Sequence, residues 1–216
     1  MALILAAERI FSEEGIGNTP LRRITQAAGQ RNESAIHYYF KSREGIVQAI
    51  LDLRTESVNA ARVAMVEAFR ARTPDAPLAS RDLAAAMVLP LAAYLKQTAG
   101  DGHYQRFLGM LTLEQTMLRK FEGRTQDNGL RLVMAALVEA KPHTPELLLR
   151  QRFAHCMSMT NMTFAGMERL AYELGPDYDW SRSEVQIENL VDCIAAVFDA
   201  PICPQTVRAL RHHGGL

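Results

Sequence analysis

Apolar residues recur along most of the chain at intervals of three and four, the spacing that places side chains on one face of an α-helix. The first such stretch contains Leu3, Ala7, Ile10 and Phe11, and Gly15 follows it as a helix-ending residue. Valine, isoleucine and threonine do not alternate with polar residues over any long stretch, so no strand is predicted. The pattern therefore predicts an all-α protein.

Capping and helix-breaking residues divide this pattern into about nine helices. Thr19 as N-cap and Pro20 as first helical residue predict the start of the second helix, which Gly29 ends. Ser42 is the predicted cap of a long fourth helix, and a proline-rich loop at 73–77 follows it. The expected helices cover roughly residues 3–14, 21–28, 34–40, 43–70, 83–97, 104–121, 126–140, 146–173 and 182–199.

Two of these helices carry more detailed expectations. Pro90 lies inside the fifth helix, and because proline has no backbone N–H we expect a kink there. Ser181 and Glu184 have the spacing of a capping box and predict the start of the ninth helix.

Composition limits the class of protein. With 216 residues and 48% hydrophobic residues, the chain can bury a sizeable core. Its 24 basic and 24 acidic residues cancel, which excludes a protein coated with basic charge, so that any nucleic-acid surface has to be local. The three cysteines do not suggest a disulfide framework, and neither a signal peptide nor a membrane-spanning segment is recognisable. We therefore expect a cytoplasmic protein without a membrane segment.

Basic charge is concentrated in residues 20–43, which contain five basic residues and a single acidic one, a net charge of +4. The same stretch predicts two short helices joined by a turn that contains Gly29, which is the pattern of a helix-turn-helix motif. The second helix of such a motif lies in the major groove of DNA. This segment therefore predicts a DNA-binding surface.

The side chains in this segment suit both parts of a DNA contact. Polar groups near the start of the second short helix can bond to base edges: Asn32, Glu33, Ser34 and His37. Three basic side chains around it can neutralise phosphate oxygens: Arg22, Lys41 and Arg43. Tyr38 and Tyr39 can donate hydrogen bonds to phosphates while their rings pack on the edge of the duplex.

The N-terminal quarter of the chain resembles the DNA-binding domain of the tetracycline-repressor (TetR) family. Three runs carry the resemblance, which spans about residues 3–52: ILAAERIFSEEG at 4–15, LRRITQAAG at 21–29 and IHYYFKSREGI at 36–46. It implies an all-α homodimer in which a three-helix DNA-binding domain, residues 1–46, precedes an effector-binding and dimerisation domain, residues 47–216. It also implies a bacterial, ligand-responsive transcription regulator, usually a repressor.

The resemblance also implies roles for individual residues. Arg22 is the position of the second helix that contacts DNA, and Arg43 is the position that grips phosphate. The recognition-helix positions are Glu33, Ser34, Ala35, His37, Tyr38 and Tyr39. The two long helices at 146–173 and 182–199 correspond to the dimer interface of the family.

The remainder of the chain is rich in methionine, an adaptable side chain that suits an irregular core as well as a ligand pocket. Both interpretations stay open at this point. In the resembling family this domain binds a small effector, often apolar or aromatic, between its helices. The candidate lining residues are Tyr94, Phe107, Met110, Met134, His155, Met159 and Met162.

No sequence motif indicates catalysis, a cofactor or a metal. The phosphate-binding, zinc-protease and serine-hydrolase motifs are absent. His155 and Cys156 are adjacent and so point in different directions on a helix. The sequence thus favours a DNA-binding regulator, a repressor that a small effector releases from a pseudo-palindromic operator. The alternatives are a small-molecule-binding helical protein that has lost operator binding and a helical-bundle enzyme.

Overall fold

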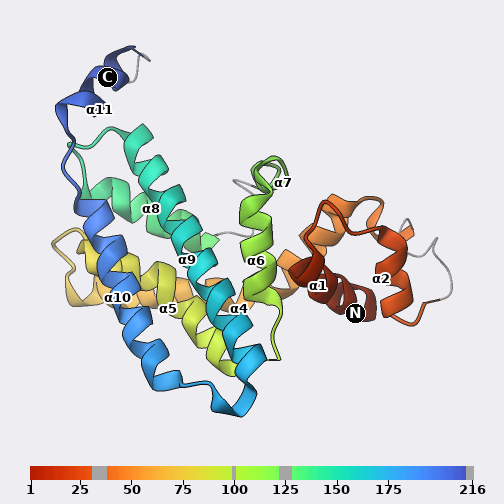
Figure 1. Cartoon of the computed structure of the whole chain (residues 1–216). Helices are drawn as coiled ribbons and strands as arrows, with labels where there is room; N and C mark the ends of the chain where they lie inside the picture. Colours follow the sequence, from red (N-terminus) through yellow and green to blue (C-terminus); the bar gives the residue numbers. More distant parts are fainter. Residues whose placement is uncertain (31–37, 99–100, 122–127, 213–216) are drawn as a thin grey trace. The chain divides into compact units, whose positions relative to one another are not determined.

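The computed structural model describes residues 1–30, 38–98, 101–121 and 128–212, and within these ranges the chain forms helices and no strand (Figure 1). The predicted all-α class is confirmed. The helices are α1 (Ala2–Glu14), α2 (Leu21–Ala27), α4 (Arg43–Arg72), α5 (Ser80–Thr98), α6 (Tyr104–Leu113), α7 (Gln115–Arg119), α8 (Asn128–Ala140), α9 (Glu146–Leu174), α10 (Trp180–Asp199) and α11 (Pro204–His212), with a short 3-10 turn at Gly175–Asp177.

Two segments differ from the predicted helices. The helix expected over 104–121 is interrupted at Glu114, whose φ of −88° and ψ of 66° separate α6 from α7. The Glu114 carboxylate accepts a hydrogen bond of 3.0 Å from the backbone N–H of Gly17, a long-range contact that helical periodicity does not register. Helix α11 was not predicted, because it is short and contains few apolar residues.

Of the two helix caps predicted near the N-terminus, one is wrong and one is confirmed. Thr19 does not cap α2, because its hydroxyl donates to the carbonyl of Gly15 at 2.7 Å and Pro20 occupies the N-cap position. The Ser42 hydroxyl accepts the Gly45 N–H at 3.2 Å, as an N-cap side chain does, which confirms the predicted start of α4.

The capping box predicted for α10 is wrong. Asp179 is the N-cap, and its carboxylate accepts from the backbone N–H groups of Ser181 at 3.0 Å and Arg182 at 3.4 Å. A carboxylate also suits the positive end of the helix dipole better than a hydroxyl. The helix consequently starts at Trp180, before the predicted cap.

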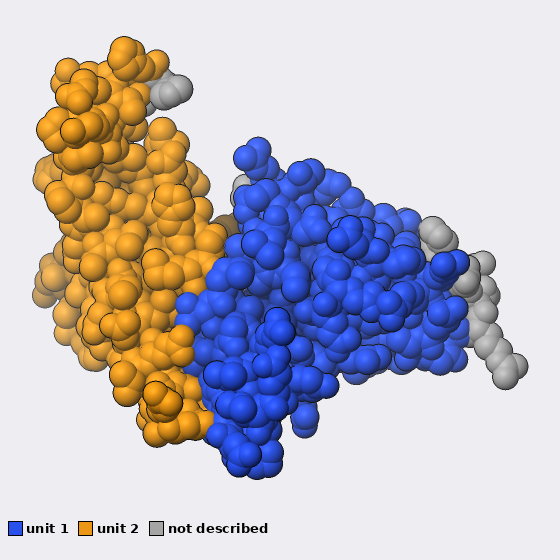
Figure 2. Space-filling view, in the orientation of Figure 1, with its two compact units in different colours: residues 1–59, 91–127, 161–178 blue, residues 60–90, 128–160, 179–216 orange. Residues whose placement is uncertain are grey.

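The described chain packs as two compact units (Figure 2). Unit 1 comprises residues 1–59, 91–127 and 161–178, and unit 2 comprises residues 60–90, 128–160 and 179–216. The boundaries fall inside α4, α5 and α9, so each of these long helices contributes one part to each unit. The division into domains of residues 1–46 and 47–216 stays a prediction about which part folds independently.

The core of unit 1 joins α1 to α6. Phe11 and Phe107 are both fully buried, and their rings stack with centroids 6.5 Å apart. Beside them Glu8 of α1 is only 2% exposed. Its two carboxylate oxygens accept from Arg54 of α4, at 3.1 Å from Nε and 2.8 Å from Nη2. This bidentate ion pair gives the buried charge both a counter-charge and hydrogen bonds.

In unit 2 a buried arginine compensates for the proline inside α5. Pro90 has no N–H for the carbonyl of Ala86, which would be its partner in a regular helix. Arg62 of α4, only 2% exposed, donates from Nε to this carbonyl at 3.1 Å and from Nη2 to the carbonyl of Met87 at 3.4 Å. Helix α5 therefore continues through Pro90, and the expected kink stays a prediction.

We predict that the cost of replacing Arg62 depends on Pro90. Arg62→Met should lower the free energy of unfolding by about 2 kcal/mol, because a buried carbonyl loses a charged donor. In the Pro90→Ala background the helix supplies its own N–H to Ala86, so the same substitution should cost clearly less. Urea denaturation of the four proteins measures this coupling, and equal costs in both backgrounds would contradict it.

Candidate nucleic-acid interface

The described residues around the predicted recognition helix have the local structure expected of a helix-turn-helix motif. Helix α1 ends at Gly15, whose φ of 88° a residue with a Cβ rarely adopts, and α2 ends before Gly29, whose φ is 68°. Ile24 is fully buried and fixes α2 in unit 1. The sequence predicted both glycines as helix ends, and this prediction is confirmed.

Five of the predicted DNA contacts lie outside the described residues: Asn32, Glu33, Ser34, Ala35 and His37. Their roles stay predictions. The described part of the interface consists of α2 and of the segment from Tyr38 to the start of α4.

Tyr38 and Tyr39 are the most prominent side chains of this interface. They are 79% and 68% exposed, and their rings meet edge to face with centroids 5.1 Å apart. Large aromatic side chains are usually buried or in contact with a partner, and tyrosine combines an apolar ring with a hydroxyl that can bond to a phosphate. The pair thus has the exposure and the chemistry predicted for contact with DNA.

The turn after the tyrosines is tight and requires a glycine. The Ser42 N–H donates to the carbonyl of Phe40 at 2.7 Å, and Lys41 has a positive φ of 61°. A Cβ at Gly45 would lie 1.9 Å from the same Phe40 carbonyl oxygen, so the first turn of α4 can approach only because this residue is glycine. The turn leaves the side chain of Lys41 exposed next to the tyrosines.

The predicted phosphate-binding cations differ in their surroundings. Arg22 and Lys41 are exposed, and neither forms an ion pair within the described part of the chain. Arg43 is half-buried, and its Nη1 donates to the carbonyls of Ile16 and Thr19, the latter at 2.7 Å. Arg43 therefore holds the loop between α1 and α2, a structural role that the sequence did not indicate.

Two further contacts attach the region around α7 to this motif. Glu114 accepts from the Gly17 N–H, and Lys120 donates to the Glu44 carboxylate at 2.6 Å. The hydrogen bond with Lys120 is the main reason why the pKa of Glu44 falls from its ordinary value to about 2. Sequence reasoning missed both contacts, since the partners lie more than 70 residues apart and match no local motif.

The seven candidate effector residues are divided between the two compact units. Four of them belong to unit 1 and three to unit 2: Tyr94, Phe107, Met110 and Met162, and Met134, His155 and Met159. Phe107 is a core residue, whereas Met162 and His155 are exposed. Tyr94 is half-buried and alone of the seven lines a hollow of about 620 Å³ in unit 1. The effector roles of the seven residues stay predictions.

Among the described residues, no group of three or more histidine, cysteine, aspartate or glutamate side chains could hold a metal ion.

No single described helix has the length and apolar character needed to cross a membrane, although the bent pair α10 and α11 meets that test when the two are taken together.

An all-α chain with an N-terminal helix-turn-helix and an exposed tyrosine–lysine surface belongs to the class of helix-turn-helix DNA-binding proteins. Comparison with protein-family models agrees. Residues 3–50 match the model of bacterial regulatory proteins of the TetR family, and residues 85–196 match the model of the tetracycline-repressor-like C-terminal domain. The second match alone covers more than half of the chain. The chain therefore belongs to the TetR family and is a DNA-binding transcriptional regulator, in a family whose members are generally not enzymes. A search of curated proteins finds no match.

We predict that Arg22 and Arg43 affect DNA binding in different ways. Arg22→Ala should reduce the slope of log affinity against log salt by about 0.9 for each chain bound to the duplex, the value for one lost phosphate contact, without changing the melting temperature. Arg43→Ala should in addition lower the free energy of unfolding by about 1.5 kcal/mol, because two loop carbonyls lose their donor. Fluorescence anisotropy with duplex DNA and thermal melts test this. Arg211→Ala in α11 is the control for charge, and an unchanged slope in Arg22→Ala would contradict the phosphate role.

The contact between Glu44 and Lys120 should depend on pH. A carboxyl whose pKa is about 2 in the folded protein and about 4.5 in the unfolded chain stabilises the fold above pH 4.5, and this stabilisation is lost as the pH falls toward 2. Lys120→Met should thus lower the melting temperature slightly at pH 7, and the difference should shrink below pH 4.5. In the Glu44→Gln background the substitution should have no such pH-dependent effect. A pH-independent difference in the wild-type background would refute the assignment.

Proposed function

We propose that the protein is a homodimeric, ligand-responsive repressor that binds a pseudo-palindromic operator in the cytoplasm and is released from it by a small effector. The observation that carries this proposal is the match of the chain to both parts of a TetR regulator, the DNA-binding domain and the C-terminal regulatory domain. The exposed Tyr38–Tyr39 pair and the uncovered cations Arg22 and Lys41 support the DNA-binding half.

A row of exposed residues on α9 supports dimerisation. Met162, Leu170 and Leu174 are 45%, 48% and 45% exposed, and with Gly166 they follow one another at intervals of four residues. Residues four apart lie on one ridge of a helix. A Cβ added at Gly166 would meet no atom within 4 Å, so the ridge contains an open position that a facing helix can approach closely.

Two copies of the motif give the protein its specificity. One helix-turn-helix reads only a few base pairs, so two copies on half-sites about 34 Å apart, or a multiple of this, multiply the discrimination between sequences. A dimer with two-fold symmetry requires an operator with matching pseudo-two-fold symmetry.

Effector binding acts through the relative stability of two dimer conformations. An apolar or aromatic effector that prefers the conformation unable to span both half-sites shifts the population toward it. A tenfold loss of operator affinity needs about 1.4 kcal/mol of difference in effector affinity between the two conformations. Helix α4 is the proposed lever, since its 30 residues start directly after the DNA-binding segment and continue into unit 2.

We predict that a charge on the α9 ridge separates the subunits. Leu170→Glu should reduce the mass seen by light scattering from two chains to one and should weaken operator binding at least tenfold, because one motif alone keeps few contacts. Leu113→Glu, at the exposed end of α6, is the matched control and should remain dimeric. A dimer that survives Leu170→Glu would place the interface elsewhere.

The rival function, a small-molecule-binding protein that has lost operator binding, predicts a different outcome in a DNA-binding assay. Selection of bound duplexes from a random library should enrich a pseudo-palindrome if the proposal holds. If no sequence is enriched while Arg22→Ala and wild type bind DNA equally weakly, operator binding is excluded.

A further inference from the structure

The hollow in unit 1 has the size and the chemistry of a ligand site. Its volume of about 620 Å³ falls in the range of small-molecule pockets. Apolar side chains from α1 and from the C-terminal end of α2 line it, among them Leu5 and Ala28. Its polar residues include Glu8 and Arg9 of α1, and Arg54, Tyr94 and His103 from farther along the chain. The lining therefore combines an apolar wall with convergent polar groups.

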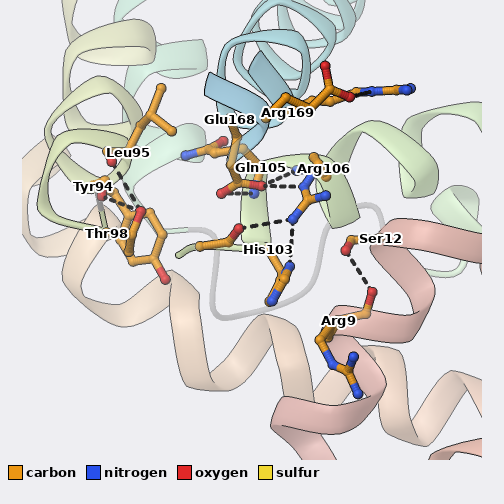
Figure 3. A network of polar contacts seen from close by, with 12 residues as sticks. Arg9, Ser12, Tyr94, Leu95, Thr98, His103, Gln105, Arg106, Glu168 and Arg169 are labelled. Carbon is orange, nitrogen blue, oxygen red and sulfur yellow. Dashed lines mark hydrogen bonds and ion pairs between the residues drawn. The ribbon is translucent and has the colours of Figure 1, made fainter. Parts of the chain in front are cut away.

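The proton on His103 is placed by its neighbour. Nη2 of Arg106 lies 2.7 Å from Nδ1 of His103, and because a guanidinium can only donate, Nδ1 has to accept. Burial and the positive charge of Arg106 both lower the pKa of His103, so the ring is neutral at pH 7 and carries its proton on Nε2. In Figure 3 the ring lies between the Arg106 guanidinium and the helix that carries Arg9, and Arg9 and His103 both line the hollow.

A fully buried carboxylate holds this arrangement in place. The side chain of Glu168 is 0% exposed and accepts from the backbone N–H groups of Gln105 at 3.2 Å and Arg106 at 2.8 Å, the first turn of α6 (Figure 3). Nε of Arg106 lies 3.6 Å from the same carboxylate, and its guanidinium stacks over the ring of Tyr172 at 4.9 Å. Arg106 is therefore fixed by several contacts, and its hydrogen bond to Nδ1 orients the ring of His103.

Arg54 and Tyr94 contribute further donors to the lining of the hollow. Arg54 uses Nε and Nη2 for Glu8, which leaves Nη1 without a partner among the described residues. Tyr94 is protonated, since burial raises the pKa of its hydroxyl, and this hydroxyl bonds to no described residue. The charge of Glu8 is balanced by that of Arg54. Arg9 and Asp101, two exposed lining residues, carry charges of opposite sign. Three donors of the lining, His103 Nε2, the Tyr94 hydroxyl and Arg54 Nη1, therefore have no acceptor among the described residues.

We propose that this hollow binds a small organic acid, whose carboxylate accepts from His103 Nε2, the Tyr94 hydroxyl and Arg54 Nη1 while its apolar body packs on Leu5 and Ala28. A charged acceptor is favoured because hydrogen bonds to a carboxylate are stronger than those to a neutral group. The ligand would touch α1 and α2 of the DNA-binding motif directly. Only its effect on operator affinity rests on the proposed function; its binding does not.

The test uses three probes of one shape and different charge on the full chain without DNA: benzoate, benzyl alcohol and benzylamine. Titration calorimetry should give a Kd on the order of 1 mM for benzoate, as expected for a ligand of about nine non-hydrogen atoms. Binding of the other two should be at least about tenfold weaker.

Variants locate the binding. Tyr94→Phe removes only the hydroxyl, and His103→Asn keeps an acceptor for Arg106 while removing the Nε2 donor; each should weaken benzoate binding about tenfold. Ala28→Leu should abolish binding by filling the hollow, and Ala64→Leu on the exposed side of α4 is its control. No benzoate binding, equal binding of benzylamine, or binding unaffected by Ala28→Leu overturns the proposal. Loss of operator binding in a chain that still binds benzoate would instead count against the proposed function alone.

Discussion

Two carboxylates without access to water constrain the packing of unit 1. Glu8 and Glu168 are 2% and 0% exposed, and a buried charge is tolerated only where charges and N–H donors surround it. Glu8 binds Arg54 and thereby ties α1 to α4, while Glu168 accepts the first N–H groups of α6 and ties that helix to α9. Each carboxylate therefore joins elements far apart in the sequence. Both also position residues that line the hollow: Glu8 binds Arg54 directly, and Glu168 fixes Arg106, which in turn orients His103.

Polar contacts between residues far apart in the sequence also link the C-terminal part of the chain to the DNA-binding part. The break between α6 and α7 places Glu114 against the loop after α1, and Lys120 meets Glu44 at the start of α4. Arg43 completes the set by holding the carbonyls of that loop. In a regulator, a change at α6 or α7 thus has direct contacts through which it can alter the support of the recognition segment. The proposed acid-binding hollow is lined by His103, the N-cap residue of α6.

Local sequence patterns correctly predicted those features of the helices that depend on residues close together in the sequence. Gly15 and Gly29 end helices, Ser42 caps α4, and the long helices α4 and α9 lie where periodicity placed them, because the backbone geometry and side-chain spacing of a helix are short-range properties. The same patterns failed at α10, where Asp179 two residues before the expected cap is the better partner for the helix end. They also failed at Glu114, where a contact with Gly17 accompanies the break.

The sequence by itself determined the all-α class, the helix-turn-helix segment with its basic and tyrosine side chains, and the family to which they belong. Only the tertiary structure decided that Arg43 supports a loop, that Arg62 replaces the N–H missing at Pro90, and that Tyr94 and His103 line one hollow. The physical reason is that these roles depend on hydrogen bonds between residues that lie 24 or more positions apart, such as Arg43 with Thr19, Arg62 with Ala86, and Arg106 with Glu168. Such contacts depend on how buried charges and packed side chains are satisfied together, which no periodicity along the chain encodes.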